Sequence, residues 1–137
     1  MDANEKLKGV NRVVKELGAD QPYKRMTGQY WWIKVVKELG ADQPNVQAGF
    51  MKLLTSAESE GKLPTKIKEL ISLALAINVK CEWCIAYHTN NCLKAGATKD
   101  EIMETASVAI LMGGAPSLMY LNPVLDALEQ LGGDQQQ

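Results

Sequence analysis

The sequence predicts an all-α fold. Apolar residues recur with helical spacing along most of the 137-residue chain, and no stretch alternates apolar and polar residues with the two-residue period of a strand. Glycine or asparagine follows several apolar runs and proline begins others, which is the usual punctuation of helices. We therefore expect a compact subunit of about six to seven helices, built as a single domain over residues 1–137.

Composition narrows the classes of partner. The chain carries 15 basic and 16 acidic side chains, for a net charge of −1, so it lacks the basic field that favours nucleic acid or anionic lipid. The N-terminus is polar without a following apolar run, and the longest apolar run, residues 70–79, is too short to span a bilayer. We expect a cytoplasmic protein that meets small molecules or proteins, with no nucleic acid and no membrane.

Residues 1–44 form an extension with an internal repeat. The ten residues 13–22 recur letter for letter as residues 35–44, and two copies are too few for a solenoid. Each copy places a glycine after an apolar helix end, so we expect helices at about 4–17 and 28–39, ended by Gly18 and Gly40.

The next two helices are expected on either side of a short loop. The first runs from Pro44 to about Glu60 and is ended by Gly61, and the second starts at Pro64. Because residues 70–77 are apolar on nearly every side, the second should be a buried central helix. Asn78 can close it in the left-handed conformation or cap the helix that follows.

Three further helical stretches complete the chain. A cysteine-bearing helix is expected at about 81–95, stopping at Gly96, and a capping box at Thr98 and Glu101 begins a helix that continues to residues 113–114. The stretch 115–131 is either one helix kinked at Pro123 or a break at which Asn122 caps a fresh helix. Residues 132–137 are expected to be a flexible tail.

The cysteine-bearing segment contains several reactive side chains close together. Helical spacing places Cys81, Cys84, His88 and Cys92 on one face, and His88 is the sole histidine of the chain. His88 follows Cys84 by one turn and Cys81 by two, so Cys84 is the better candidate for activation to the thiolate. Cys81 can then attack an oxidised Cys84, since an i,i+3 pair lies at about the 5–6 Å Cα separation that a disulfide tolerates.

Other uses of a Cys-x-x-Cys pair fit less well. Haem attachment needs histidine directly after the second cysteine, where Ile85 stands, and the thioredoxin form needs a preceding strand. Four ligands on one face of one helix cannot surround zinc tetrahedrally. We expect Cys92 to be a small buried hydrophobe, and we expect neither a metal nor a cofactor.

The spacing of these residues resembles a known family. Glu69, eleven intervening residues, Cys81-x-x-Cys84 and three more residues to His88 are similar to the Glu-x11-Cys-x2-Cys-x3-His signature of the alkylhydroperoxidase D-like and carboxymuconolactone decarboxylase family. The segment 95–102, Ala-Gly-Ala-Thr-x-x-Glu-Ile, is similar too, and the resemblance covers the core at residues 45–131. In well-known members a second histidine can stand between the cysteines, where this chain has Trp83.

The resemblance implies a fold and an activity. It implies an all-helical subunit with the cysteine pair at the start of a central helix, assembled as a homotrimer or homohexamer. It further implies an antioxidant thiol peroxidase or disulfide reductase, in which Cys84 is the peroxidatic thiol, Cys81 the resolving thiol, and Glu69 and His88 the proton relay. The partners would be a small hydroperoxide and a dithiol reductant, either a protein or a lipoamide-type donor.

Two alternatives stay open. One is a redox-sensing or non-catalytic oligomeric module, whose disulfide alters assembly or partner binding. The other is a cofactor-free lyase of the carboxymuconolactone decarboxylase type, which has no evident use for a thiol pair and should need cationic groups to hold its substrate. Glu69 borders an apolar helix, so its carboxyl should be partly desolvated and suited to proton transfer with His88.

Overall fold

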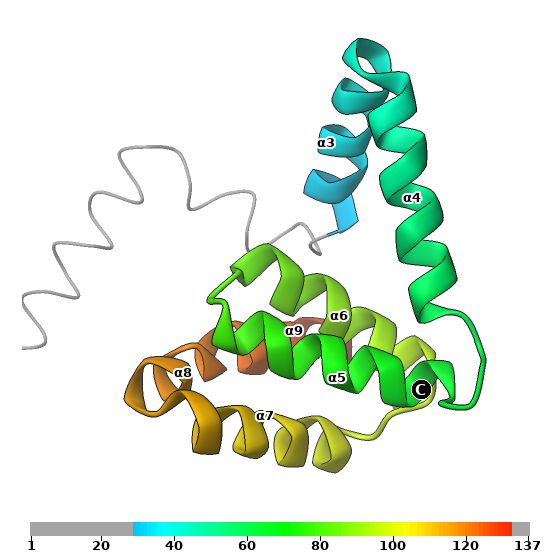
Figure 1. The fold of residues 1–137 in the computed structure, drawn as a ribbon. Helices are drawn as coiled ribbons and strands as arrows, with labels where there is room; N and C mark the ends of the chain where they lie inside the picture. The colour runs from blue at the N-terminus through cyan, green and yellow to red at the C-terminus, as the bar shows by residue number, and fades with distance from the viewer. Residues whose placement is uncertain (1–28, 133–137) are drawn as a thin grey trace, which may run out of the picture.

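The computed structural model describes residues 29–132, and these residues fold into helices joined by short loops, with no strand among them (Figure 1). The predicted helix at 4–17, the first copy of the repeat and the tail at 133–137 lie outside the described residues. The helices are α3 (Gln29–Asp42), α4 (Pro44–Glu58), α5 (Thr65–Asn78), α6 (Glu82–Lys94), α7 (Lys99–Gly113), α8 (Ala115–Met119) and α9 (Leu121–Gly132).

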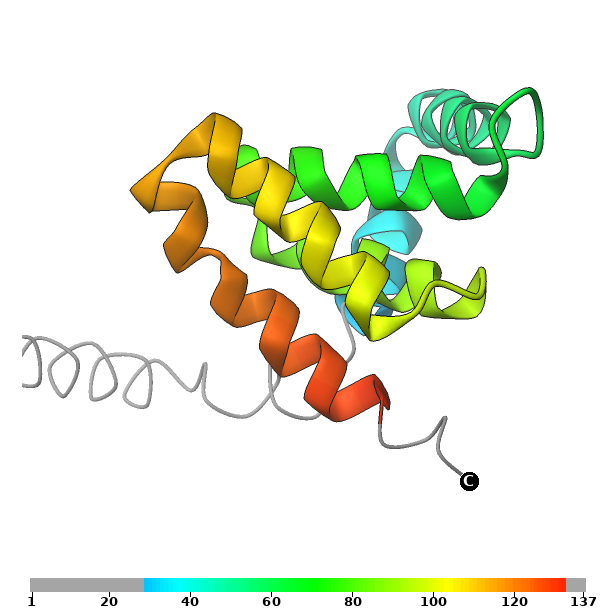
Figure 2. The ribbon, with the colours of Figure 1, turned by 90° about the horizontal axis from the view of Figure 1, so that it is seen from below.

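The helices divide into an arm and a body. The hairpin of α3 and α4 projects from one end, and α5 to α9 form the body (Figure 1). Within the body α5 packs against α6 and α7, and α6 packs against α9. The short helix α8 turns the chain between α7 and α9, as the view in Figure 2 shows.

The hydrophobic core lies in the body. Helix α4 has no buried residue, whereas every helix from α5 to α9 contributes at least one. The largest fully buried side chains, all of them on α5 to α9, are Leu73, Ile77, Ile85, Thr89, Cys92, Ile102, Ser117 and Val124. Helix α4 therefore adds to the subunit without sharing its core.

The boundary between α3 and α4 is not set by glycine, which corrects the predicted end at Gly40. Helix α3 continues through Gly40 to Asp42, and Gln43 N donates to Leu39 O at 2.6 Å, so the helical bonding persists. Proline lacks an N–H and forces the residue before it out of the helical region. Gln43 accordingly has φ −131° and ψ 71°, and Pro44 begins α4 as predicted.

Helix α4 also ends before its predicted glycine. It stops at Glu58, with Ser59 extended at its C-terminus, whereas the expected end was near Glu60 with Gly61 as terminator. Lys68 donates to Ser59 O at 2.7 Å from the following helix, so the loop is held by side chains of α5.

Helix α5 is central, but it is not buried on every side as predicted. Leu73, Ala76 and Ile77 face the core, while Ile71 and Leu75 are exposed in the subunit. The end of α5 differs as well, because the left-handed residue is Lys80 at φ 58° and not Asn78. Lys80 N donates to Ile77 O and Cys81 N to Ala76 O, which is the Schellman pattern with Lys80 in the place that glycine usually takes.

The remaining boundaries follow local signals. Gly96, at φ 88°, closes α6 as predicted, and the capping box of Thr98 and Glu101 begins α7. The stretch 115–131 is broken at Tyr120, so α9 starts at Leu121 and holds Pro123 in its first turn, where its missing N–H costs no helical bond. This is nearer to the expected alternative in which a new helix begins before Pro123, but the helix starts at Leu121, one residue before the expected cap Asn122. None of the helices in residues 29–132 has the length and apolar character needed to cross a membrane.

Candidate active site

The two cysteines of the motif form a disulfide at the start of α6. Cys81 is the N-cap of that helix, one residue before its first residue Glu82, whereas the helix was expected to begin at about Cys81 itself; its Cα lies 5.2 Å from that of Cys84. Cys84 N donates to Cys81 Sγ at 3.2 Å, so the sulfur takes the place of the capping oxygen found in most helices. This position at a helix N-terminus favours negative charge, and it would stabilise a thiolate on Cys81 in the reduced protein.

One turn after Cys84, His88 meets a buried carboxylate. Its Nδ1 lies 2.7 Å from Glu69 Oε2, and the Glu69 side chain is 4% exposed. Asn91, one turn further along α6, donates from Nδ2 to Glu69 Oε1 at 3.4 Å. The interface of α5 and α6 thus brings together two residues that the sequence separates by 19 positions, and the contact expected between them is present.

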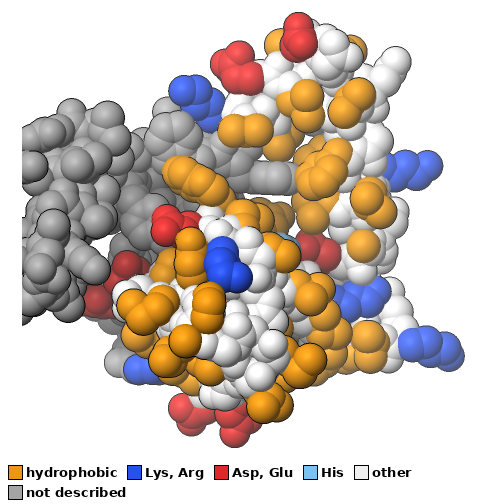
Figure 3. Space-filling view, turned by 60° about the vertical axis from the view of Figure 1, so that its left-hand side comes forward, with side chains coloured by type: hydrophobic (Ala, Val, Ile, Leu, Met, Phe, Trp, Pro, Cys, Tyr) orange, Lys and Arg blue, Asp and Glu red, His pale blue; other side chains and the backbone are white. Residues whose placement is uncertain are grey.

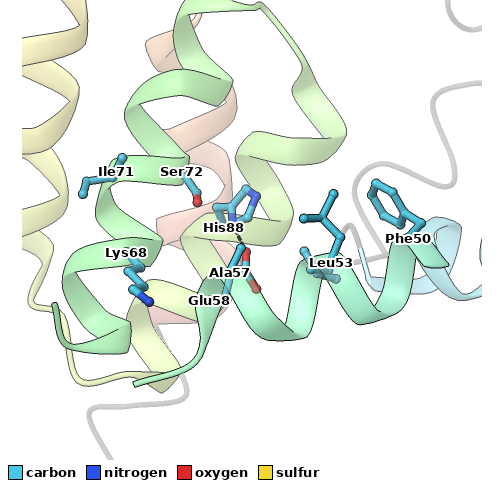
Figure 4. A pocket seen from close by; sticks show the side chains of 9 residues that line it. Phe50, Leu53, Ala57, Glu58, Lys68, Ile71, Ser72 and His88 are labelled. Carbon is cyan, nitrogen blue, oxygen red and sulfur yellow. Dashed lines mark ion pairs between the residues drawn. The ribbon is translucent and has the colours of Figure 1, made fainter. Parts of the chain in front are cut away.

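A second carboxyl reaches the same histidine. Glu58, the last residue of α4, places Oε1 3.6 Å from His88 Nδ1, as the dashed line in Figure 4 marks. Burial raises the pKa of Glu58 to about 7, helped by the negative charge of Glu69 and by a hydrogen bond between the two carboxyls, and opposed by His88. One carboxyl of the pair therefore holds a proton for much of the time at neutral pH.

Glu58 escapes prediction from the sequence. It lies outside the Glu-x11-Cys-x2-Cys-x3-His signature, and Glu60 stands two residues away with the same chemistry. One signal does exist: an acidic residue at the C-terminus of a helix is opposed by the helix dipole. Such local conflicts tend to mark functional positions.

An open pocket leads to this group. It has a volume of about 390 Å³ and lies between α4, α5 and α6, with His88 and Glu58 among its lining residues (Figure 4). The other lining residues are Phe50, Leu53, Leu54, Ala57, Lys68, Ile71 and Ser72. The pocket is therefore largely apolar, with its ionisable groups gathered where α4 ends.

Tyr87 and Cys92 border the site with different consequences. The Tyr87 ring stands edge-on to the His88 ring, with centroids 5.0 Å apart, and burial raises the pKa of its hydroxyl. Cys92 is fully buried, as expected, and burial followed by the charge of Glu69 raises the pKa of its thiol to about 12. Cys92 therefore stays protonated and takes the part of a small apolar side chain.

Within residues 29–132, Glu58, Glu69 and His88 also form a cluster of side chains of the kinds that ligate metals. Their ligand atoms lie within 4.8 Å of one another, close enough for one divalent cation. However, His88 Nδ1 and Glu69 Oε2 are already hydrogen bonded at 2.7 Å, and ligands of one zinc ion at about 2.0–2.2 Å stand more than about 3 Å apart. The arrangement fits proton exchange better than metal ligation, so we assign no metal to it.

The structure thus gathers the predicted residues into one site. Cys81, Cys84 and His88 come from α6 and its N-cap, and Glu69 comes from α5. Cys84 is half-buried in the subunit.

The chain is similar to known proteins over more than half of its length. The family model described as the carboxymuconolactone decarboxylase family matches residues 44–127. An uncharacterized protein of Cupriavidus necator is 36% identical over 84 residues, which are 61% of this chain and 74% of that protein. Uncharacterized protein 4 in the cox locus of Paracoccus denitrificans is 30% identical over 89 residues, which are 65% of this chain and 80% of the relative.

Solved structures of similar fold extend the comparison. A carboxymuconolactone decarboxylase family protein from Legionella pneumophila has a TM-score of 0.69 and 34% identity, covering 81% of this chain and 95% of its own. A family protein from Thermotoga maritima, for which a part in an antioxidative response has been suggested, has a TM-score of 0.71 and 27% identity over 78% of this chain and 92% of its own.

Proposed function

Because the chain belongs to the carboxymuconolactone decarboxylase family, we propose that it is a thiol-dependent peroxidase or disulfide oxidoreductase of that family. The observation that carries the proposal is the Cys81–Cys84 disulfide, set one turn before a histidine that is hydrogen bonded to the buried Glu69. A vicinal thiol pair beside an acid–base group is the equipment for cycling between dithiol and disulfide.

The proposed reaction begins with the Cys84 thiolate. His88 removes the thiol proton, and the sulfur attacks the terminal oxygen of a hydroperoxide, giving a sulfenic acid on Cys84 and an alcohol. Cys81 then attacks the sulfenic sulfur and releases water, which leaves the disulfide. A dithiol donor, either a protein or a lipoamide-type molecule, returns both thiols to the reduced state.

The pocket supports an organic hydroperoxide as the oxidant. Its apolar walls from α4 and α5 suit an alkyl or aryl group, and His88, which stands one turn after Cys84, is among its lining residues. A lyase acting on a carboxylated substrate has less support. Among the lining residues Lys68 is the cation, and its ammonium already donates to Ser59 O.

The test is a thiol count coupled to turnover. Reduced protein is mixed with cumene hydroperoxide, and we expect the thiols of Cys81 and Cys84 to be lost while that of Cys92 remains. With dihydrolipoamide in excess, peroxide consumption should continue. Cys92→Ser is the matched control and should behave as wild type. Loss of thiols without turnover for every dithiol donor tried would favour a redox-sensing module, and retention of all thiols would refute the proposal.

A further inference from the structure

Glu58 gives the site a second carboxyl from outside the family signature. We propose that Glu58 is the proton-transfer residue that connects His88 with the pocket, while Glu69 holds His88 in place. The proposal rests on the thiol chemistry proposed above. It makes the arm part of the reaction centre, because Glu58 belongs to α4 and the other members belong to α5 and α6.

Glu58 and Glu69 differ in burial, and this difference supports different roles for their carboxyls. The Glu69 side chain is 4% exposed, and its two oxygens are engaged by His88 and Asn91. Such a carboxylate can fix the orientation of an imidazole, but it has little access to water or substrate. The Glu58 side chain is 18% exposed, lines the pocket and still lies 3.6 Å from the same imidazole nitrogen (Figure 4).

The charges around Glu58 suit proton exchange near neutral pH. Glu69 and Lys68 face it from α5, and His88 and Tyr87 face it from α6. Burial and Glu69 together raise the pKa of Glu58 to about 7 in spite of His88. A group that is half protonated at the working pH can both give and accept a proton.

Hydrogen bonds from α5 fix the place of Glu58. Thr65 Oγ1 donates to Glu58 O at 2.9 Å, and Lys68 Nζ donates to Ser59 O at 2.7 Å. Thr65 N donates to Glu60 Oε1 at 2.9 Å, so Glu60 anchors the loop while Glu58 faces the histidine. Because α4 buries no residue of its own, these bonds set the position of the carboxyl against α6.

The proton balance of the reaction indicates the step in which Glu58 would take part. When the Cys84 thiolate attacks a hydroperoxide, an S–O bond forms, the O–O bond breaks and the alkoxide must take up one proton. When Cys81 attacks the sulfenic acid, an S–S bond forms and the departing hydroxide takes up a second proton to become water. Both protons are those the two thiols gave up. Glu58 would hold one of them beside His88 and return it to the alkoxide.

The experiment compares wild type with Glu58→Gln, Glu58→Asp and Glu104→Gln. The last variant makes the same change at an exposed residue of α7 and is the control. For each reduced protein, the rate of Cys84 alkylation by iodoacetamide is measured from pH 5 to 9. The rate of thiol loss to cumene hydroperoxide is measured in a single turnover.

We expect wild type and Glu104→Gln to show a step in the alkylation profile near pH 7, and Glu58→Gln to lack it. Oxidation by the hydroperoxide should slow by about 10²-fold in Glu58→Gln, at the low end of what positioned acid–base groups contribute. In Glu58→Asp the step should return at lower pH, because the shorter carboxyl is withdrawn from Glu69. A Glu58→Gln profile equal to that of Glu104→Gln would overturn the proposal.

The two proposals can fail separately. If wild type keeps its thiols in hydroperoxide, the peroxidase is refuted, but alkylation needs only the thiol and still reports whether Glu58 acts on it through His88. If Glu58→Gln does not fold, as judged by circular dichroism, Glu58→Asp decides the matter. A step in the profile of that variant at the same pH as in wild type would contradict the role of Glu58.

Discussion

His88 Nδ1 and Glu69 Oε2 lie 2.7 Å apart across the interface of α5 and α6, and this contact fixes which nitrogen of a neutral imidazole is left to act as a base. A carboxylate can only accept, so Nδ1 carries a proton and donates it to Glu69. The free electron pair of a neutral His88 is then on Nε2. The base available to a thiol is therefore Nε2, held in one orientation by a buried partner.

Loss of either partner should slow formation of the thiolate. We expect Glu69→Gln and His88→Gln each to lower the Cys84 alkylation rate at neutral pH by about 10²-fold or more, the usual contribution of a positioned acid–base group. Since the two residues act as a unit, the double variant should be little slower than the slower single variant. Alkylation rates against pH measure this, and losses that multiply in the double variant would show that the two side chains act independently.

The two cysteines should fail in different ways. Cys84→Ser should abolish reaction with hydroperoxide, because Cys84 stands one turn from His88. Cys81→Ser should allow one oxidation, to a sulfenic acid, and then stall. Mass spectrometry after dimedone trapping distinguishes the cases, with Cys92→Ser as control. A sulfenic acid found on Cys81 in the Cys84→Ser variant would reverse the assignment.

Stability should depend on pH through Glu58. Its pKa is about 7 in the folded protein against an ordinary value of 4.5, so the folded state binds the proton more tightly. The resulting stabilisation is fully present below pH 4.5 and is lost as the pH rises through 7. Glu58→Gln should therefore gain stability over wild type at pH 8 relative to pH 5, by about 1 kcal/mol once screening by water is allowed for. Urea unfolding at the two pH values measures it, and Glu104→Gln should show no such difference.

Helix α7 ends at Gly113, where the structure leaves no room for a Cβ atom. A Cβ at Gly113 would collide with Ser117 Oγ and Asn78 Oδ1, which are hydrogen bonded to each other at 2.6 Å. Gly113→Ala should therefore destabilise the fold by about 1–3 kcal/mol, as overpacking does. Gly49, on α4, has open space around it, so Gly49→Ala should instead stabilise by up to about 1 kcal/mol. Thermal unfolding of both variants compares them directly, and equal shifts would contradict the account.

The subunit should assemble into a trimer or a dimer of trimers. Apolar side chains are spread over its surface (Figure 3), and several lie near the α7–α8 turn. Leu111 and Met112 are 79% and 76% exposed. A contiguous patch of exposed apolar side chains is typical of a surface that another protein subunit covers. Light scattering should give three or six times the 15.0 kDa chain mass, and Leu111→Glu should lower it. A wild-type monomer at micromolar concentration would refute the prediction.

The parts of the fold that sequence predicts are those decided locally. The capping box at Thr98 and the stop at Gly96 are settled by a few neighbouring residues, and both appear as expected. Gly40 shows the limit: glycine can end a helix, but it can also continue one, and Pro44 decides where α3 stops. Lys80 takes the left-handed position although asparagine adopts it more readily. Asn78 instead accepts a hydrogen bond from Ser117, 39 residues away.

The same division holds for the site. The spacing of Glu69, Cys81, Cys84 and His88 is a property of the sequence. Contact between Glu69 and His88 could be expected because their helices are consecutive. Glu58 could not be identified, because its meeting with His88 depends on the angle at which α4 leaves the body. That angle is set by bonds from Thr65 and Lys68 to backbone oxygens, which carry no sequence signature.

Because α4 has no buried residue, the side chains with which it lines the pocket are not the ones that form the core. Phe50, Leu53, Leu54 and Ala57 form one wall of the pocket, yet none of them belongs to the core. Mutation can reshape that wall at little cost to folding, since core packing is where most severe destabilisation originates. Under the proposed function, selectivity would thus be free to diverge while the thiol chemistry on α5 and α6 stays fixed.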